Sequence, residues 1–114
     1  MEKLNFQSTI QLRNGVKMPL FGFGTAEIAP TLMEQISIIG DAIDVGYRLL
    51  DTAQIYHTER GVGEAIKNSG IDRDDFFIST KIWNGEARRG KTAILRAFEE
   101  SLRRLNTEYV DLLI

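Results

Sequence analysis

Apolar residues recur at helical spacing in three stretches of the chain, and short runs of β-forming residues stand between them. Ile36, Ile39 and Ile43, for example, share one face of a helix that begins after Thr31. The Asn14-Gly15 dipeptide tolerates the positive φ angles of a tight turn. The pattern therefore predicts a hairpin at 6–20, helices at 31–45, 58–69 and 93–105, and strands that start near residues 20, 47, 76 and 109.

Strands and helices alternate with a period of roughly 30 residues, which is the size of a βαβ unit. Such units predict an α/β fold with a parallel sheet and right-handed crossovers. Two architectures fit: an open doubly wound sheet, or the N-terminal half of a TIM (β/α)8 barrel, which needs ~250 residues. The last predicted strand, at 109–114, is followed by no turn or covering helix. We therefore expect residues 1–114 to be one partial domain of a larger protein.

Composition changes this picture little, but it excludes several kinds of function. Lys and Arg number 14 and Asp and Glu number 16, so the formal net charge is −2, and no clustered positive charge predicts binding to nucleic acid or an anionic membrane. The sequence has no cysteine and a single histidine, His57, which excludes disulfides, thiolate chemistry and Cys/His metal sites within the chain. Without a signal-peptide core or a run of ~18 apolar residues, we expect a cytoplasmic protein.

Three polar side chains fall at the predicted carboxyl ends of the second and third parallel strands, or in the loop that follows: Asp51, Tyr56 and Lys81. In parallel α/β folds this edge is where ligands bind. A lysine ammonium held beside a tyrosine hydroxyl favours the phenolate, so the tyrosine can donate a proton at neutral pH. Carbonyl reduction needs such an acid, together with hydride from a cofactor. The same residues also fit a purely structural interpretation, with a loop cap, an ion pair and a rim aromatic.

Four segments of the sequence resemble the aldo-keto reductase superfamily, in the order and at the spacing of that family. They are GVKMPLFGFGT, AIDVGYRLLDTAQIYHTERGVGEAI, FFISTKIWN and ESLRRLNTEYVDLLI. Within the family they are similar to the 2,5-diketo-gluconate reductase-like group. The resemblance implies a (β/α)8 barrel with an N-terminal hairpin at its bottom, and NADPH-dependent reduction of aldehydes and ketones. It therefore favours the barrel over the doubly wound sheet.

The resemblance also implies a catalytic role for each of the three polar residues. Tyr56 resembles the family's general acid, Lys81 the cation that activates this acid, and Asp51 the carboxylate that holds the cation. The family's fourth catalytic position is a His after the fourth strand, and this sequence ends at Ile114, before that position. His57 directly follows the tyrosine, and we expect it to be a solvated loop side chain. We therefore expect the isolated chain to be inactive.

Parts of the family's cofactor and substrate sites also fall within the chain. Gly24, Thr25 and Asp51 resemble residues at the nicotinamide end of NADPH, whereas the family grips the cofactor's phosphates in the last quarter of the barrel, outside this chain. Trp83 and Tyr56 resemble residues that line the pocket for a small aldehyde or ketone. Trp83 fits a core position at the end of a strand equally well.

Two other functions also fit the sequence. The residues from Gly85 to Thr92 fit the GxxxxGKT pattern of a phosphate-binding loop, which is typical of nucleoside-triphosphate-binding proteins. Such a loop normally leaves its strand directly, whereas Lys81 and Trp83 intervene here. Alternatively, the chain is a non-catalytic half-barrel scaffold or binding module. In a half barrel, the open strand edges predict self-association.

Individual side chains give further local predictions. Thr58 stands where the family commonly has Asn, and its hydroxyl is expected to cap the N-terminus of the second helix. On the third helix, Glu99 with Arg103 and Glu100 with Arg104 predict two ion pairs at i,i+4 spacing.

Overall fold

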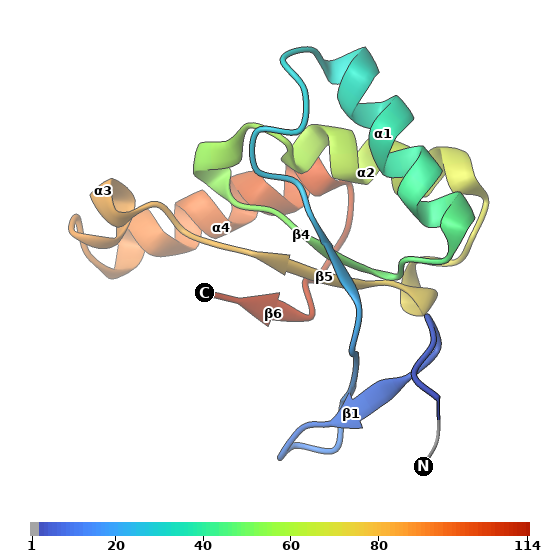
Figure 1. The fold of residues 1–114 in the computed structure, drawn as a ribbon. Coiled ribbons are helices and arrows are strands. Elements are labelled where there is room, and N and C mark those ends of the chain that lie inside the picture. The colour runs from blue at the N-terminus through green and yellow to red at the C-terminus, as the bar shows by residue number, and fades with distance from the viewer. Residues whose placement is uncertain (1–2) are drawn as a thin grey trace.

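Four parallel strands form the centre of the protein (Figure 1), whose computed structural model describes residues 3–114. Their order in the sheet is their order in the chain, and each pairs in parallel with the next. A doubly wound sheet reverses its strand order, whereas a (β/α)8 barrel does not. The sheet therefore has the topology of the N-terminal half of a barrel, with strands β3 (Gly22–Gly24), β4 (Leu49–Asp51), β5 (Phe77–Thr80) and β6 (Leu112–Leu113).

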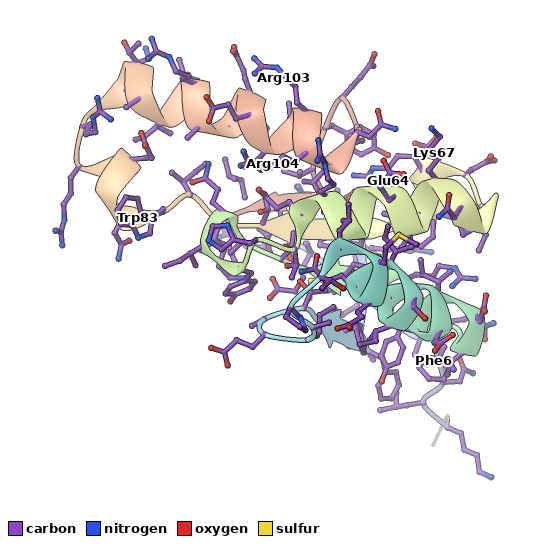
Figure 2. All side chains as sticks on the ribbon, turned by 90° about the horizontal axis from the view of Figure 1, so that it is seen from above. Phe6, Glu64, Lys67, Trp83, Arg103 and Arg104 are labelled. Carbon is purple, nitrogen blue, oxygen red and sulfur yellow. The ribbon has the colours of Figure 1, made fainter. Side chains whose placement is uncertain are left out.

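Three long helices lie side by side on one face of this sheet (Figures 1 and 2). They are α1 (Leu32–Val45), α2 (Glu59–Ser69) and α4 (Lys91–Leu105), and each of the predicted helices is confirmed. The ends of α1 follow the local signals: the Thr31 hydroxyl accepts a hydrogen bond from the Glu34 amide at 3.2 Å, and Gly46 ends the helix with a φ of 129°.

The hydrophobic core fills the space between the helices and the sheet. Leu50 and Ile78, from the two central strands, are completely buried there. Helix α2 is the middle helix and contacts both α1 and α4. The core cluster consists of Ile39, Ile43, Leu50, Val62, Ala65, Ile66, Phe76, Ile78 and Leu105. Among residues 3–114, no helix is both long enough and apolar enough to pass through a bilayer.

A hairpin of β1 (Thr9–Gln11) and β2 (Lys17–Pro19) lies at the lower end of the sheet, as predicted (Figure 1). Its turn uses Gly15 at a φ of 87°. Next to it, the Phe6 ring packs edge-on against Tyr47 with the ring centroids 4.9 Å apart. At the opposite side of the sheet, β6 leaves Leu112 and Leu113 about 40% exposed. Self-association through open strand edges stays a prediction.

The segment after β5 differs from its prediction. The strand ends at Thr80, and a short helix, α3 (Asn84–Ala87), lies where the sequence fits a phosphate-binding loop. A phosphate-binding loop keeps its amides free for phosphate oxygens. Here the amides of Ala87 and Arg88 instead donate to the carbonyls of Trp83 and Asn84. The alternative of a phosphate-binding loop is therefore contradicted, because a helical turn uses these donors.

Candidate active site

The carboxyl ends of β4 and β5 bring Asp51 and Lys81 into a close ion pair. Lys81 Nζ lies 2.8 Å and 2.9 Å from the two carboxylate oxygens and donates a third hydrogen bond to the carbonyl of Thr52 at 3.1 Å. The Ser79 hydroxyl donates to Asp51 Oδ1 at 2.6 Å. All three ammonium protons are thereby used, which fixes the position of the positive charge. Both side chains remain about 30% exposed, so this charge faces the open edge of the sheet.

Tyr56 lies beside this ion pair. It is the last residue of the short helix η1 (Gln54–Tyr56), in the turn between β4 and α2. Lys81 Nζ is 4.9 Å from the centroid of the Tyr56 ring, within the range of a cation–π contact. The structure thus brings together the three residues that the sequence places at this edge. The next residue, His57, has a left-handed φ of 57° and an exposed side chain, as expected for the loop.

The end of β3 contributes Gly24 and Thr25 to the same edge. Gly24 pairs with Asp51 in the parallel ladder, it is exposed, and a Cβ placed on it would meet nothing within 4 Å. Space is therefore open for a planar group against this backbone. Thr25, in contrast, is completely buried, and its hydroxyl donates to the Asp51 carbonyl at 2.8 Å.

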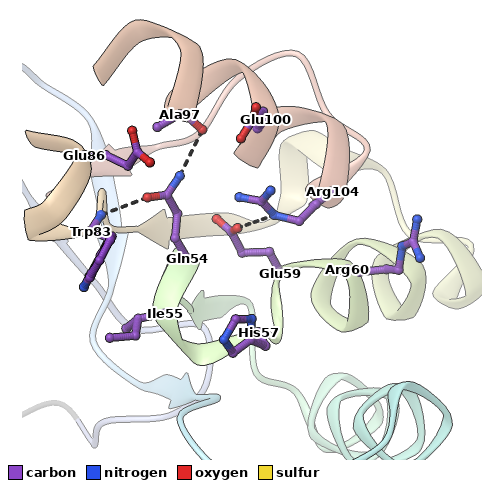
Figure 3. Close-up of a pocket in the computed structure, with 10 residues that line it drawn as sticks. All are labelled: Gln54, Ile55, His57, Glu59, Arg60, Trp83, Glu86, Ala97, Glu100 and Arg104. Atoms are coloured by element: carbon purple, nitrogen blue, oxygen red, sulfur yellow. Dashed lines mark hydrogen bonds and ion pairs between the residues drawn. The ribbon is translucent and has the colours of Figure 1, made fainter. Parts of the chain in front are cut away.

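Trp83 is 52% exposed, so its interpretation as a core residue is wrong. Its backbone amide donates to Gln54 Oε1 at 2.8 Å, and Gln54 Nε2 donates to the Ala97 carbonyl at 3.1 Å (Figure 3). One glutamine side chain therefore ties the tryptophan-bearing segment and α4 to the turn that carries Tyr56. The sequence contained no local signal for this bridge, because its partners stand 29 and 43 residues away.

Three threonine hydroxyls form a buried chain that sequence reasoning missed. The Thr58 hydroxyl lies 2.7 Å from that of Thr25 and 2.8 Å from that of Thr52. Thr58 occupies the N-cap position of α2, but its side chain makes no capping hydrogen bond. The capping prediction is wrong, because the Thr58 hydroxyl bonds the hydroxyls of Thr25 and Thr52 instead of an amide of α2.

A second missed group joins α2 and α4 to the sheet. Glu59, only 1% exposed, accepts hydrogen bonds from Arg104 Nε at 2.8 Å and from the Thr80 hydroxyl at 2.7 Å. In Figure 2, Arg104 points from α4 toward α2, whereas Arg103 lies on the outer side. Arg103 pairs with Glu99 at 3.9 Å as predicted. The predicted pair of Arg104 with Glu100 is wrong, because the Arg104 guanidinium binds the buried carboxylate of Glu59 instead.

A cavity of about 740 Å³ lies next to the Gln54 bridge (Figure 3). None of Asp51, Tyr56 and Lys81 lines this cavity. Its walls come from η1, α2, α4 and the segment after β5, and they include Gln54, Ile55, Glu59, Trp83, Ala97 and Arg104.

The parallel strand order is that of part of a (β/α)8 barrel, and the Asp–Lys–Tyr group lies at the carboxyl edge of this sheet. The chain belongs to the aldo/keto reductase family, whose family model matches residues 20–114.

Among curated proteins, the chain is 50% identical over 103 residues to morphine 6-dehydrogenase of Pseudomonas putida, covering 90% of this chain and 33% of that protein. It is 44% identical over 108 residues to glyoxal reductase of Bacillus subtilis, covering 95% and 38%. Among solved structures, an aldo-keto reductase of Bombyx mori in complex with NADP superposes with a TM-score of 0.83 at 32% identity, covering 93% of this chain and 36% of that one. The chain thus spans between 33% and 38% of the two curated relatives.

Proposed function

We propose that this chain supplies the proton donor of an NADPH-dependent reductase that converts small aldehydes and ketones to alcohols. The observation that carries the proposal is the contact of Lys81 with both Asp51 and Tyr56 at the carboxyl edge of the sheet. Further support comes from the relatives, because one of them is named a glyoxal reductase and a neighbouring structure holds NADP.

The residues of this edge fit the nicotinamide end of the cofactor. Gly24 is exposed with open space above its backbone, and the Asp51–Lys81 pair is partly exposed next to it. When bound, NADPH supplies hydride to the carbonyl carbon. Thr25 acts here only from beneath, because the residue is completely buried and its hydroxyl and its amide both donate to the Asp51 carbonyl.

Each side chain then has a separate task in the reaction. The Tyr56 hydroxyl donates its proton to the carbonyl oxygen, so that the C=O double bond becomes a C–OH single bond. The phenolate that remains on Tyr56 is stabilised by the positive charge of Lys81. Asp51 holds this charge in place, because its carboxylate accepts two hydrogen bonds from the ammonium. The half-exposed Trp83 ring offers an apolar surface to the substrate.

Replacing Tyr56 by Phe removes the proposed acid while keeping the ring that contacts Lys81. In the complete product of the gene that encodes this chain, we expect Tyr56→Phe to lower kcat for glyoxal reduction on the order of 100-fold or more, the contribution of a positioned general acid. NADPH affinity, measured by fluorescence titration, is expected to stay at the wild-type value. Tyr109→Phe is the matched control, since Tyr109 bonds Asp74 far from this edge. A Tyr56→Phe protein that retains the wild-type kcat contradicts the proposal.

A further inference from the structure

The threonine chain at the base of the Tyr56 turn is fully shielded from solvent: Thr25 and Thr52 are 0% exposed and Thr58 is 1% exposed. Its hydrogen bonds have only one possible direction. The Asp51 carbonyl can only accept, so Thr25 donates its one hydroxyl proton there. Thr25 therefore accepts from Thr58, and Thr58 accepts from Thr52. The proton of each of the three hydroxyls is thus assigned, and none of these hydroxyls can rotate without breaking a buried hydrogen bond.

These hydroxyls connect the two ends of the turn that carries Tyr56. Thr52 is the first and Thr58 the last residue of the turn between β4 and α2, and the 2.8 Å contact between their hydroxyls closes the turn at its base. Within the turn, His57 adopts a left-handed φ of 57°, which a residue with a side chain holds only when its surroundings require it. The Thr52–Thr58 contact is one of the constraints that hold this turn.

Thr25, at the other end of the threonine hydroxyl chain, is bonded to the backbone of Asp51, a member of the ion pair. The hydroxyl and the amide of Thr25 both donate to the carbonyl of Asp51, at 2.8 Å and 3.1 Å. The carboxylate of this same residue binds Lys81. One continuous set of hydrogen bonds therefore runs from the turn that carries the tyrosine to the backbone of the residue that holds the lysine.

We propose that the Thr52–Thr58–Thr25 hydroxyl chain is a positioning device that sets the Tyr56 ring against Lys81. The proposal deepens the proposed reductase function and rests on it for its kinetic consequences. The use of Thr58 supports it: at a helix N-cap position, its hydroxyl bonds the two other threonines instead of the free amides of α2.

The test replaces Thr58 by Val, which keeps the side-chain shape and removes the hydroxyl. The conservative variant Thr58→Ser keeps the hydroxyl, and Thr92→Val makes the same chemical change at an exposed position on α4. In the complete gene product, we expect Thr58→Val to lower kcat for glyoxal reduction on the order of 10- to 100-fold, because small displacements of a reacting group have such effects. We expect its NADPH affinity to be unchanged, Thr58→Ser to restore most of kcat, and Thr92→Val to match the wild type.

A second readout does not depend on activity. In the wild-type protein, NMR is expected to show a nuclear Overhauser effect between the Lys81 ε-methylene protons and the Tyr56 ring, because the two groups are in contact. This effect should be lost in Thr58→Val and kept in Thr58→Ser. If Thr58→Val does not fold, Thr52→Val carries the same test, since it removes only the terminal hydrogen bond of the chain.

The outcomes separate the two proposals. A folded Thr58→Val or Thr52→Val protein with the wild-type kcat and an intact Lys81–Tyr56 effect overturns the positioning role, even if its melting temperature falls. A wild-type protein that shows the effect but reduces no carbonyl compound overturns the reductase function, while the response of the effect to Thr58→Val still decides the positioning role.

Discussion

Gly63 and Gly40 are both interior helix glycines, but their surroundings predict opposite responses to alanine. A Cβ on Gly63 in α2 would lie 2.6 Å from the carbonyl oxygen of Leu105 and 2.9 Å from that of Arg104, at the end of α4. A Cβ on Gly40 in α1 would meet nothing within 4 Å. Neither glycine has a positive φ, so the difference lies in packing alone.

The magnitudes follow from two terms. Alanine in place of an interior helix glycine stabilises by about 1 kcal/mol, because the unfolded chain loses conformational freedom. At position 40 this term acts by itself. At position 63 the new methyl group overlaps backbone atoms, which cannot rotate away as a side chain can, and overpacking of this kind costs about 3 kcal/mol. We therefore expect Gly40→Ala to stabilise by about 1 kcal/mol and Gly63→Ala to destabilise by about 2 kcal/mol.

Urea denaturation followed by far-ultraviolet circular dichroism measures both free energies of unfolding in the complete gene product. Each variant is the control for the other, since the chemical change and the helix propensity term are the same. If Gly63→Ala proved as stable as Gly40→Ala, the close backbone approach of α2 and α4 would be refuted, and with it the packing that buries Glu59.

Two further predictions concern polar contacts. Arg104→Ala leaves the buried Glu59 carboxylate with the Thr80 hydroxyl as its only partner. Because Arg104 is 38% exposed, we expect the free energy of unfolding in urea to fall by roughly 2 kcal/mol, which is below the range for a fully buried pair. If an Arg104→Ala, Glu59→Gln double variant lost the sum of both single effects, this coupling would be contradicted. The hydrogen bond that Tyr109 donates to Asp74 at 2.7 Å raises the pKa of Tyr109. The associated stability is therefore present below the unfolded-state pKa of ~10 and lost as the pH rises through the higher folded-state pKa. Asp74→Ala removes the acceptor and should lower the titration midpoint of Tyr109 in ultraviolet absorbance, and an unchanged midpoint would contradict the assignment.

The sequence alone was sufficient where the signals are local. The start of α1 depends on Thr31 and Glu34, three positions apart, and its end depends on Gly46, so that neighbouring residues carry all the information. The alternation of strands and helices likewise predicted the parallel sheet. At its carboxyl edge, the ends of neighbouring strands meet, which is why Asp51 and Lys81 could be expected to lie together although 30 residues separate them.

Where a polar side chain has several possible hydrogen-bond or ion-pair partners, only the tertiary structure decided between them. Thr58 can cap α2. In the folded chain, however, its hydroxyl is buried between an acceptor, the Thr25 hydroxyl, and a donor, the Thr52 hydroxyl, and water does not reach this place. Arg104 can pair with Glu100 on its own helix. It pairs instead with Glu59, because the Glu59 carboxylate is only 1% exposed and an unpaired charge there would cost more free energy. A polar group shielded from water loses more free energy when unpaired than an exposed one. Which groups are shielded depends on the packing of α2 between α1 and α4 over the sheet, and this packing is a property of the folded chain.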